Sequence, residues 1–187
     1  AMKIPGLTRS TFKGGYTHSF WKADVATGEA KEVWHNQPGD FTFATAANMR
    51  LAGDSLVFRF NIGGGRGGGG GRGQAPAEAP PAPTDEWDRY YSLNLNTPDS
   101  KPLLLTTTDG LIEDQTSVTL SADEKTFYYC TNAKDIERRH IWAVPVAGGT
   151  PVQLTTGTGI ETYPMALPSG KWLATLSAGW KMPQSVG

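Results

Sequence analysis

Few residues of this sequence have the type and spacing that nucleophilic catalysis needs. A Gly-x-Ser-x-Gly turn is the usual signal of a serine nucleophile, and the nearest approach, Gly-Asp-Ser-Leu-Val at 53–57, lacks the last glycine and fits a hairpin turn. The three histidines, His18, His35 and His140, have no recognisable serine and acid partners nearby. The single cysteine, Cys130, ends an apolar run and is predicted to be a small buried side chain. We therefore expect no catalytic residue in this chain.

Metal and nucleotide sites are not indicated by spacing either. The lone cysteine and the scattered histidines do not form a zinc-binding pattern. Three neighbouring acid pairs lack the spacing of a calcium loop: Asp85-Glu86, Glu113-Asp114 and Asp123-Glu124. The run at 63–68 satisfies G-x-G-x-x-G, but no helix follows it and the Lys-Ser/Thr of a phosphate-binding loop is absent. We expect no metal and no cofactor.

Residues 63–85 form a low-complexity segment. Nine glycines and two arginines occupy 63–73, and four prolines follow in 74–84. Such a composition buries too little apolar surface to offset its ordering entropy, so we predict a flexible surface insertion. Its Arg-Gly pairs hint at RNA binding, but two arginines in a chain of net charge −1 argue against a nucleic-acid partner. No run of 18 apolar residues occurs, so we expect no membrane partner.

The elements that would position any site are repeated strand pairs. Three segments alternate apolar and small or polar residues, turn at Gly or Pro, and resume about five residues later: 20–34, 90–104 and 141–155. Trp21, Tyr91 and Trp142 hold the same place in them, at steps of 70 and 51 residues. A second series, a polar turn followed by a β-rich strand, begins near Ser55, Lys125 and Lys171, at steps of 70 and 46 residues.

Both series agree on the first step, and subtracting the insertion brings it to the length of a four-stranded propeller blade. We therefore predict an all-β chain, a partial β-propeller of three to four four-stranded antiparallel blades. An antiparallel sandwich with regular turns is the alternative. The incomplete propeller spans 1–187, with blades at 7–34 (partial), 41–108, 114–156 and 160–187 (partial). So few blades cannot close a ring, and we expect the rest of it to lie outside this sequence.

The last two predicted blades contain sequence motifs that resemble known repeats. Residues 141–155 resemble the W-x-V-x-x-x-G-G-x-P-x-Q-L-T strand pair of TolB-type propellers. Residues 157–164 and 169–174, which include a Gly-Ile-Glu-Thr-x-Pro run, resemble the N-terminal propeller of prolyl oligopeptidase-family serine peptidases, such as the dipeptidyl peptidase IV-like and acylaminoacyl-peptidase-like enzymes. This resemblance implies a non-catalytic propeller that admits short peptides to a following α/β-hydrolase domain, and it mildly favours a periplasmic or secreted location.

The resemblance leaves two functions open. The first is substrate gating for a serine oligopeptidase, with the peptide substrate and the C-terminal hydrolase domain or remaining blades as partners. The alternative is a TolB-like protein-binding propeller without enzymatic activity. The adjacent glutamates that dipeptidyl peptidases use to hold a substrate amino terminus are absent here. Glu161 precedes an inner strand, the strand type that lines a propeller channel, and we predict a substrate-channel position for it.

Overall fold

The computed structural model describes residues 15–16, 18–37, 46–61, 85–97, 100–112 and 117–187. Thirteen β-strands are the regular elements in these ranges, and no helix among them could span a membrane. The predicted insertion at 63–85 lies outside the described residues, apart from Asp85.

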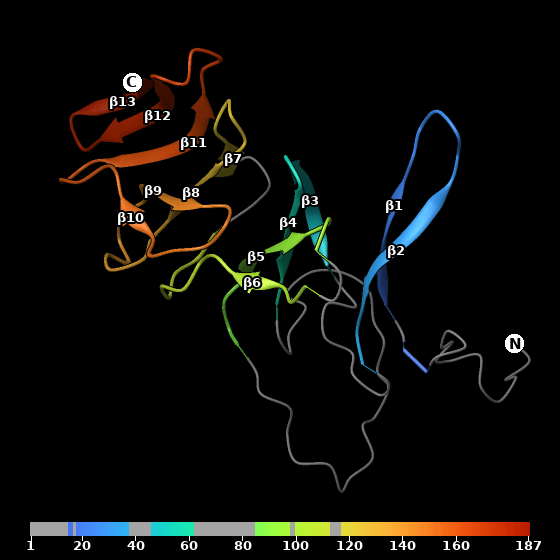
Figure 1. Ribbon diagram of the computed structural model, residues 1–187. Coiled ribbons are helices and arrows are strands. Elements are labelled where there is room, and N and C mark those ends of the chain that lie inside the picture. The colour runs from blue at the N-terminus through green and yellow to red at the C-terminus, as the bar shows by residue number, and fades with distance from the viewer. Residues whose placement is uncertain (1–14, 17, 38–45, 62–84, 98–99, 113–116) are drawn as a thin grey trace, which may run out of the picture.

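The strands form four antiparallel sheets that lie side by side in chain order (Figure 1). The first sheet pairs β1 (Ser19–Ala23) with β2 (Ala30–His35). The second has β3 (Ala47–Ala52), β4 (Ser55–Phe60), β5 (Arg89–Asn94) and β6 (Leu103–Leu104) in that order. The third has β7 (Val118–Leu120), β8 (Thr126–Thr131), β9 (His140–Pro145) and β10 (Val152–Gln153). The fourth has β11 (Ile160–Ala166), β12 (Leu173–Gly179) and β13 (Met182–Val186).

This arrangement confirms the predicted fold class. The described part of the chain is all-β, with the stacked, sequential, up to four-stranded antiparallel sheets of a partial β-propeller. The division of the whole sequence into blades, which includes residues outside the described ranges, stays a prediction.

One step of the predicted repeat differs by a residue in the structure. Phe58 faces Tyr91 in the second sheet, and Tyr129 faces Trp142 in the third, so β4 and β8 are related by a step of 71 residues rather than 70. The reason is the hairpin before each strand. Gly53 and Asp54 make a two-residue turn, with Gly53 at a φ of 55°, whereas four residues join Ser121 to Thr126.

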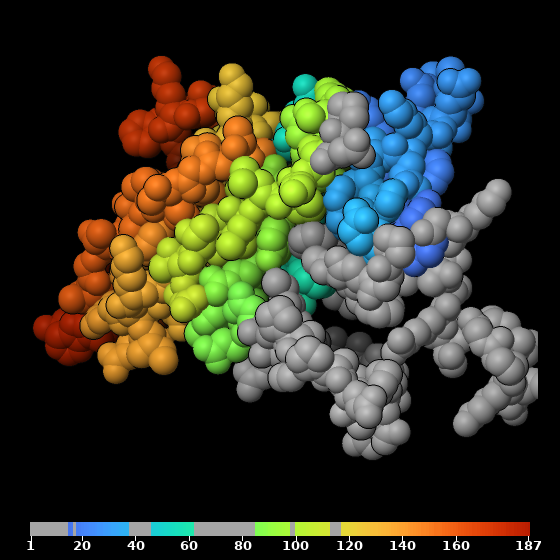
Figure 2. All heavy atoms as spheres, turned by 60° about the horizontal axis from the view of Figure 1, so that its bottom comes forward, coloured from blue at the N-terminus to red at the C-terminus, as the bar shows by residue number. Residues whose placement is uncertain are grey.

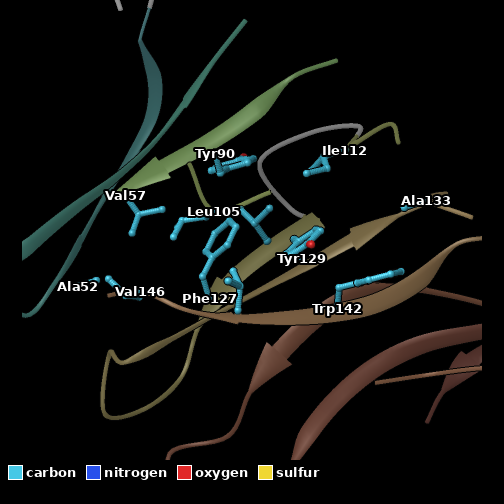
Figure 3. Close-up of a cluster of buried hydrophobic side chains, with 12 residues drawn as sticks. Ala52, Val57, Tyr90, Leu105, Ile112, Phe127, Tyr129, Ala133, Trp142 and Val146 are labelled. Carbon is cyan, nitrogen blue, oxygen red and sulfur yellow. The ribbon is translucent and has the colours of Figure 1, made fainter. Parts of the chain in front are cut away.

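The second and third sheets pack face to face around the main core, shown in Figure 3. The Tyr90 ring of β5 lies 4.8 Å, centroid to centroid, from the Phe127 ring of β8. The buried cluster is Ala52, Val57, Tyr90, Leu105, Ile112, Val118, Phe127, Tyr129, Ala133, Trp142, Val144 and Val146. Because β4 and β5 are covered on both faces, they are apolar on both faces rather than alternating.

A second cluster joins the first sheet to the other face of the second. Phe20 of β1 contacts Phe58 of β4 at 5.1 Å between ring centroids, and Tyr91 and Leu93 of β5 complete the contact. In the space-filling view the first, second and third sheets follow one another as adjoining layers (Figure 2). The first three sheets are thus positioned by aromatic side chains of their neighbours.

The fourth sheet presents an apolar face that no described residue covers. The pairs Ile160–Ala178, Thr162–Leu176, Met165–Ala174 and Leu176–Val186 place these side chains on one face. Met165 is 64% exposed and Val186 is 77% exposed. The equivalent faces of the second and third sheets are each buried by the next sheet. The partners expected for this chain, remaining blades or a hydrolase domain, stay predictions.

Candidate functional site

Glu161, the predicted channel residue, lies on β11 and bridges the third and fourth sheets. Its carboxylate Oε2 lies 2.8 Å from Nδ1 of His140 on β9, and both side chains are largely buried. A carboxylate acceptor at this distance orients the imidazole with its Nδ1–H toward β11. The contact couples two neighbouring sheets, and the substrate-channel position of Glu161 stays a prediction.

Cys130 is next to this contact. Its Sγ donates to the backbone carbonyl of Glu161 at 3.2 Å, and the residue is 2% exposed. The prediction of a small buried side chain is therefore confirmed.

The other two histidines lie near the first sheet. His35 stacks on Tyr16 with ring centroids 4.2 Å apart, and its Nδ1 lies 2.8 Å from the carbonyl oxygen of Asn36. His18 meets the edge of Phe20 at 5.1 Å. Among the described residues no three His, Cys, Asp or Glu side chains converge in a way that could hold a metal ion.

The position of His18 gives a pH prediction. Burial lowers the pKa of His18 below its ordinary value near 6.5. Below pH 6.5 the unfolded chain protonates His18 more readily than the folded chain does. The stability that depends on neutral His18 is therefore fully present above pH 6.5 and is lost as the pH falls through the lowered pKa. We expect His18→Phe to lose less free energy of unfolding than the wild type between about pH 7.5 and 5.5. Urea unfolding of both proteins at several pH values measures this, and parallel curves would contradict it.

Two of the acid pairs act in structural contacts. Asp85 binds the guanidinium of Arg89, with Oδ2 2.7 Å from Nε. Glu124 accepts the backbone N–H of Gly53 at 2.7 Å and so joins the third sheet to the second. Asp123 accepts the Ser121 hydroxyl within its own turn at 2.6 Å. Glu113 and Asp114 lie outside the described residues.

A groove of about 1260 Å³ lies between the β1–β2 hairpin and the end of the second sheet. The two sheets are in contact at the Phe20–Phe58 cluster and separate toward the hairpin tip, where residues 21–31 are all exposed. Val33, Trp34 and Leu95 pack partly against the cluster and also line the groove, so its floor is apolar.

The walls of the groove are polar and come from different sheets. The hairpin supplies one wall, and Asn96, Thr97, Ser100 and Lys101 supply the other. Lys22 on β1 reaches across, and its Nζ donates to Oδ1 of Asn96 at 2.9 Å. An apolar floor between polar walls is the usual construction of a binding site.

Sequence reasoning did not find this groove. The sequence does carry one signal for its walls, since Lys22 and Lys31 are spaced about the 24–29 turn so that a hairpin places them opposite each other. The separation of the two sheets above their common core has no such signal.

Comparison with known proteins gives no family for this chain. No protein-family model matches it, and no curated protein matches it. Among solved structures it is similar to the crystal structure of TolB from Acinetobacter baumannii, with a TM-score of 0.46 and 14% sequence identity. The match covers 90% of this chain and 34% of that one, so the chain spans about a third of the length of the TolB structure. None of the comparisons supports the expected relation to prolyl oligopeptidases, and peptidase gating stays a prediction.

Proposed function

We propose that this chain is a protein-binding propeller segment that holds an extended polypeptide in the groove between the first and second sheets. The supporting observation is the groove itself, which has an apolar floor and polar walls on two separate sheets. Its volume of about 1260 Å³ exceeds the usual range of small-molecule pockets, roughly 300–1,000 Å³, and it is open to solvent. A peptide chain fits such a shape because it presents side chains to both walls at once.

Filling the groove tests this function. Lys31 lies directly opposite Lys22, whose side chain reaches the far wall, so a large side chain at position 31 enters the groove. We expect wild-type protein to bind a subset of an array of immobilised heptapeptides, and Lys31→Trp to lose that subset. Lys171→Trp, at an exposed position in the β11–β12 loop, is the matched control and should bind like the wild type.

Two results would overturn the proposal. One is the absence of bound peptides on the array, and the other is unchanged binding by Lys31→Trp.

A further inference from the structure

The outer strand of the first sheet is long and has an open edge. β2 has six residues and pairs with β1, and no described strand pairs with its second edge. The strands in the same outer place of the second and third sheets, β6 and β10, have two residues each and directly follow Pro102 and Pro151. A short strand and a neighbouring proline both blunt an edge, because they leave few N–H groups for another strand. β2 has neither feature.

The groove runs along this open edge. Every residue in 29–35 lines it, whereas a groove over one face of the strand would be lined by alternate residues. Lys31 shares the face of Lys22, whose ammonium group reaches the far wall, so the side chains of Ala30 and Glu32 lie on the opposite face. Ala30 and Glu32 therefore line the groove from the edge of the strand, where their backbone lies.

The backbone groups of Ala30 and Glu32 point away from β1. The Asp24 N–H donates to the Glu29 carbonyl at 2.8 Å, so these two residues form a hydrogen-bonded pair at the end of the β1–β2 ladder. Bonded pairs alternate with non-bonded pairs in an antiparallel ladder, which makes the pair of Lys31 the next bonded one. The residues on either side of Lys31 then turn their N–H and C=O groups outward. Each offers one donor and one acceptor that no strand in the described part of the chain receives.

We propose that the polypeptide held in this groove adds to β2 as a third strand and is recognised through its backbone. This inference rests on the proposed function and states how the same site takes its ligand. The added strand continues the ladder that β1 forms with β2, and its side chains alternate between the apolar floor and the opposite face of the sheet. The register shift opposite Val33 ends the regular ladder, so the new hydrogen bonds are to Ala30 and Glu32. The ligand is thus an extended segment with apolar side chains at alternate positions and free N–H groups facing β2.

The first test is a backbone scan of the ligand. A heptapeptide that the wild-type protein binds on the array is labelled and N-methylated at one residue at a time, which removes one N–H and leaves every side chain in place. Fluorescence anisotropy with the full chain measures the affinities. We expect a loss of about tenfold at residues whose N–H faces β2 and of less than about twofold at the residues between them, so the losses alternate along the peptide.

Matched variants test the protein side of the same bonds. Ala30→Pro removes an outward N–H that β1 does not use, and should weaken peptide binding about tenfold with little change in the urea midpoint. Ala30→Ser keeps that N–H and should bind within about twofold of the wild type. Hydrogen exchange of the wild type needs no substitution. Bound peptide should slow exchange of the Ala30 and Glu32 amides by about tenfold or more.

The outcomes separate this inference from the proposed function. If N-methylation costs less than about twofold at every residue and Lys31→Trp still abolishes binding, the added strand is wrong and the groove function stands. If no heptapeptide binds, both proposals fail. Equal binding by Ala30→Pro and Ala30→Ser, with no protection of the two amides, also overturns the added strand. A concentration-dependent dimer of the free chain that Ala30→Pro dissociates would assign the edge to a second copy and overturn it as well.

Discussion

Phe127→Ala is expected to lower the free energy of unfolding by about 3–5 kcal/mol. Phe127 is completely buried on β8, between Val144 of β9 and Leu120 of β7, and its ring contacts Tyr90 of the second sheet. The substitution removes the transfer free energy of the ring and leaves a cavity between the second and third sheets. Each sheet is held in shape by its own backbone pairing, so the two cannot close the cavity fully. Urea unfolding should show a lower midpoint at an unchanged slope.

Trp180→Ala is the control for aromatic truncation. Trp180 is 86% exposed in the turn between β12 and β13, so its loss should change the unfolding free energy by less than about 0.5 kcal/mol. A loss below about 1 kcal/mol for Phe127→Ala would contradict the packing of the second sheet on the third.

Arg89→Met is expected to cost about 2 kcal/mol, because it removes a nearly buried guanidinium that donates to two aspartates and two backbone carbonyls. The guanidinium joins the start of β5 to the segment after β6. Its Nε lies 2.7 Å from Asp85 and its Nη2 lies 2.6 Å from Asp109, while Nη1 donates to the carbonyls of Thr106 and Thr108 at 3.2 and 3.0 Å. Methionine keeps similar bulk but leaves the two carbonyls without this donor and the partly buried Asp85 carboxylate with the Trp87 amide alone.

The pH dependence of this contact has a defined sign. Burial alone would raise the pKa of Asp85, but the hydrogen bonds from Arg89 and from the Trp87 amide, with the Arg89 charge, hold that pKa below its ordinary value. The stabilisation is therefore present above the ordinary carboxyl pKa and is lost as the pH falls through the lowered one. Lowering the pH should bring the wild type and Arg89→Met closer together in stability.

Arg59→Met is the matched control on the neighbouring strand. Arg59 also binds an aspartate, Asp88, at 3.0 Å, but both side chains are more than a quarter exposed. An ion pair that water reaches contributes at most about 1 kcal/mol. Equal losses for Arg89→Met and Arg59→Met would mean that the Arg89 contact is an ordinary surface pair.

The sheets could be predicted from the sequence because hairpins are local. Apolar residues on both sides of each strand, with Gly or Pro at the turns, fix the pairing of β8 with β9 within about 20 residues of chain. The step of 71 residues at Tyr129 was missed because the lengths of the two hairpin turns differ, which alters spacing without altering the pattern.

Contacts between sheets could not be predicted in the same way. Arg89 meets Asp109 from another segment, and His140 meets Glu161 from another sheet, so neither pair has a characteristic spacing. The groove depends on how far the β1–β2 hairpin extends beyond the Phe20–Phe58 contact. That distance is set by packing between sheets and not by any local pattern.

The central claim, a propeller segment that holds a polypeptide in the groove between its first two sheets, is tested most directly by mapping bound peptide on the protein. In a ¹⁵N-correlated NMR titration with a heptapeptide that the wild-type protein binds on the array, the largest shift changes should fall on the amides of Lys22, Lys31 and Leu95 and on the Trp34 indole. Shift changes gathered on the exposed apolar face of β11–β13, or none on the groove residues at saturating peptide, would contradict it.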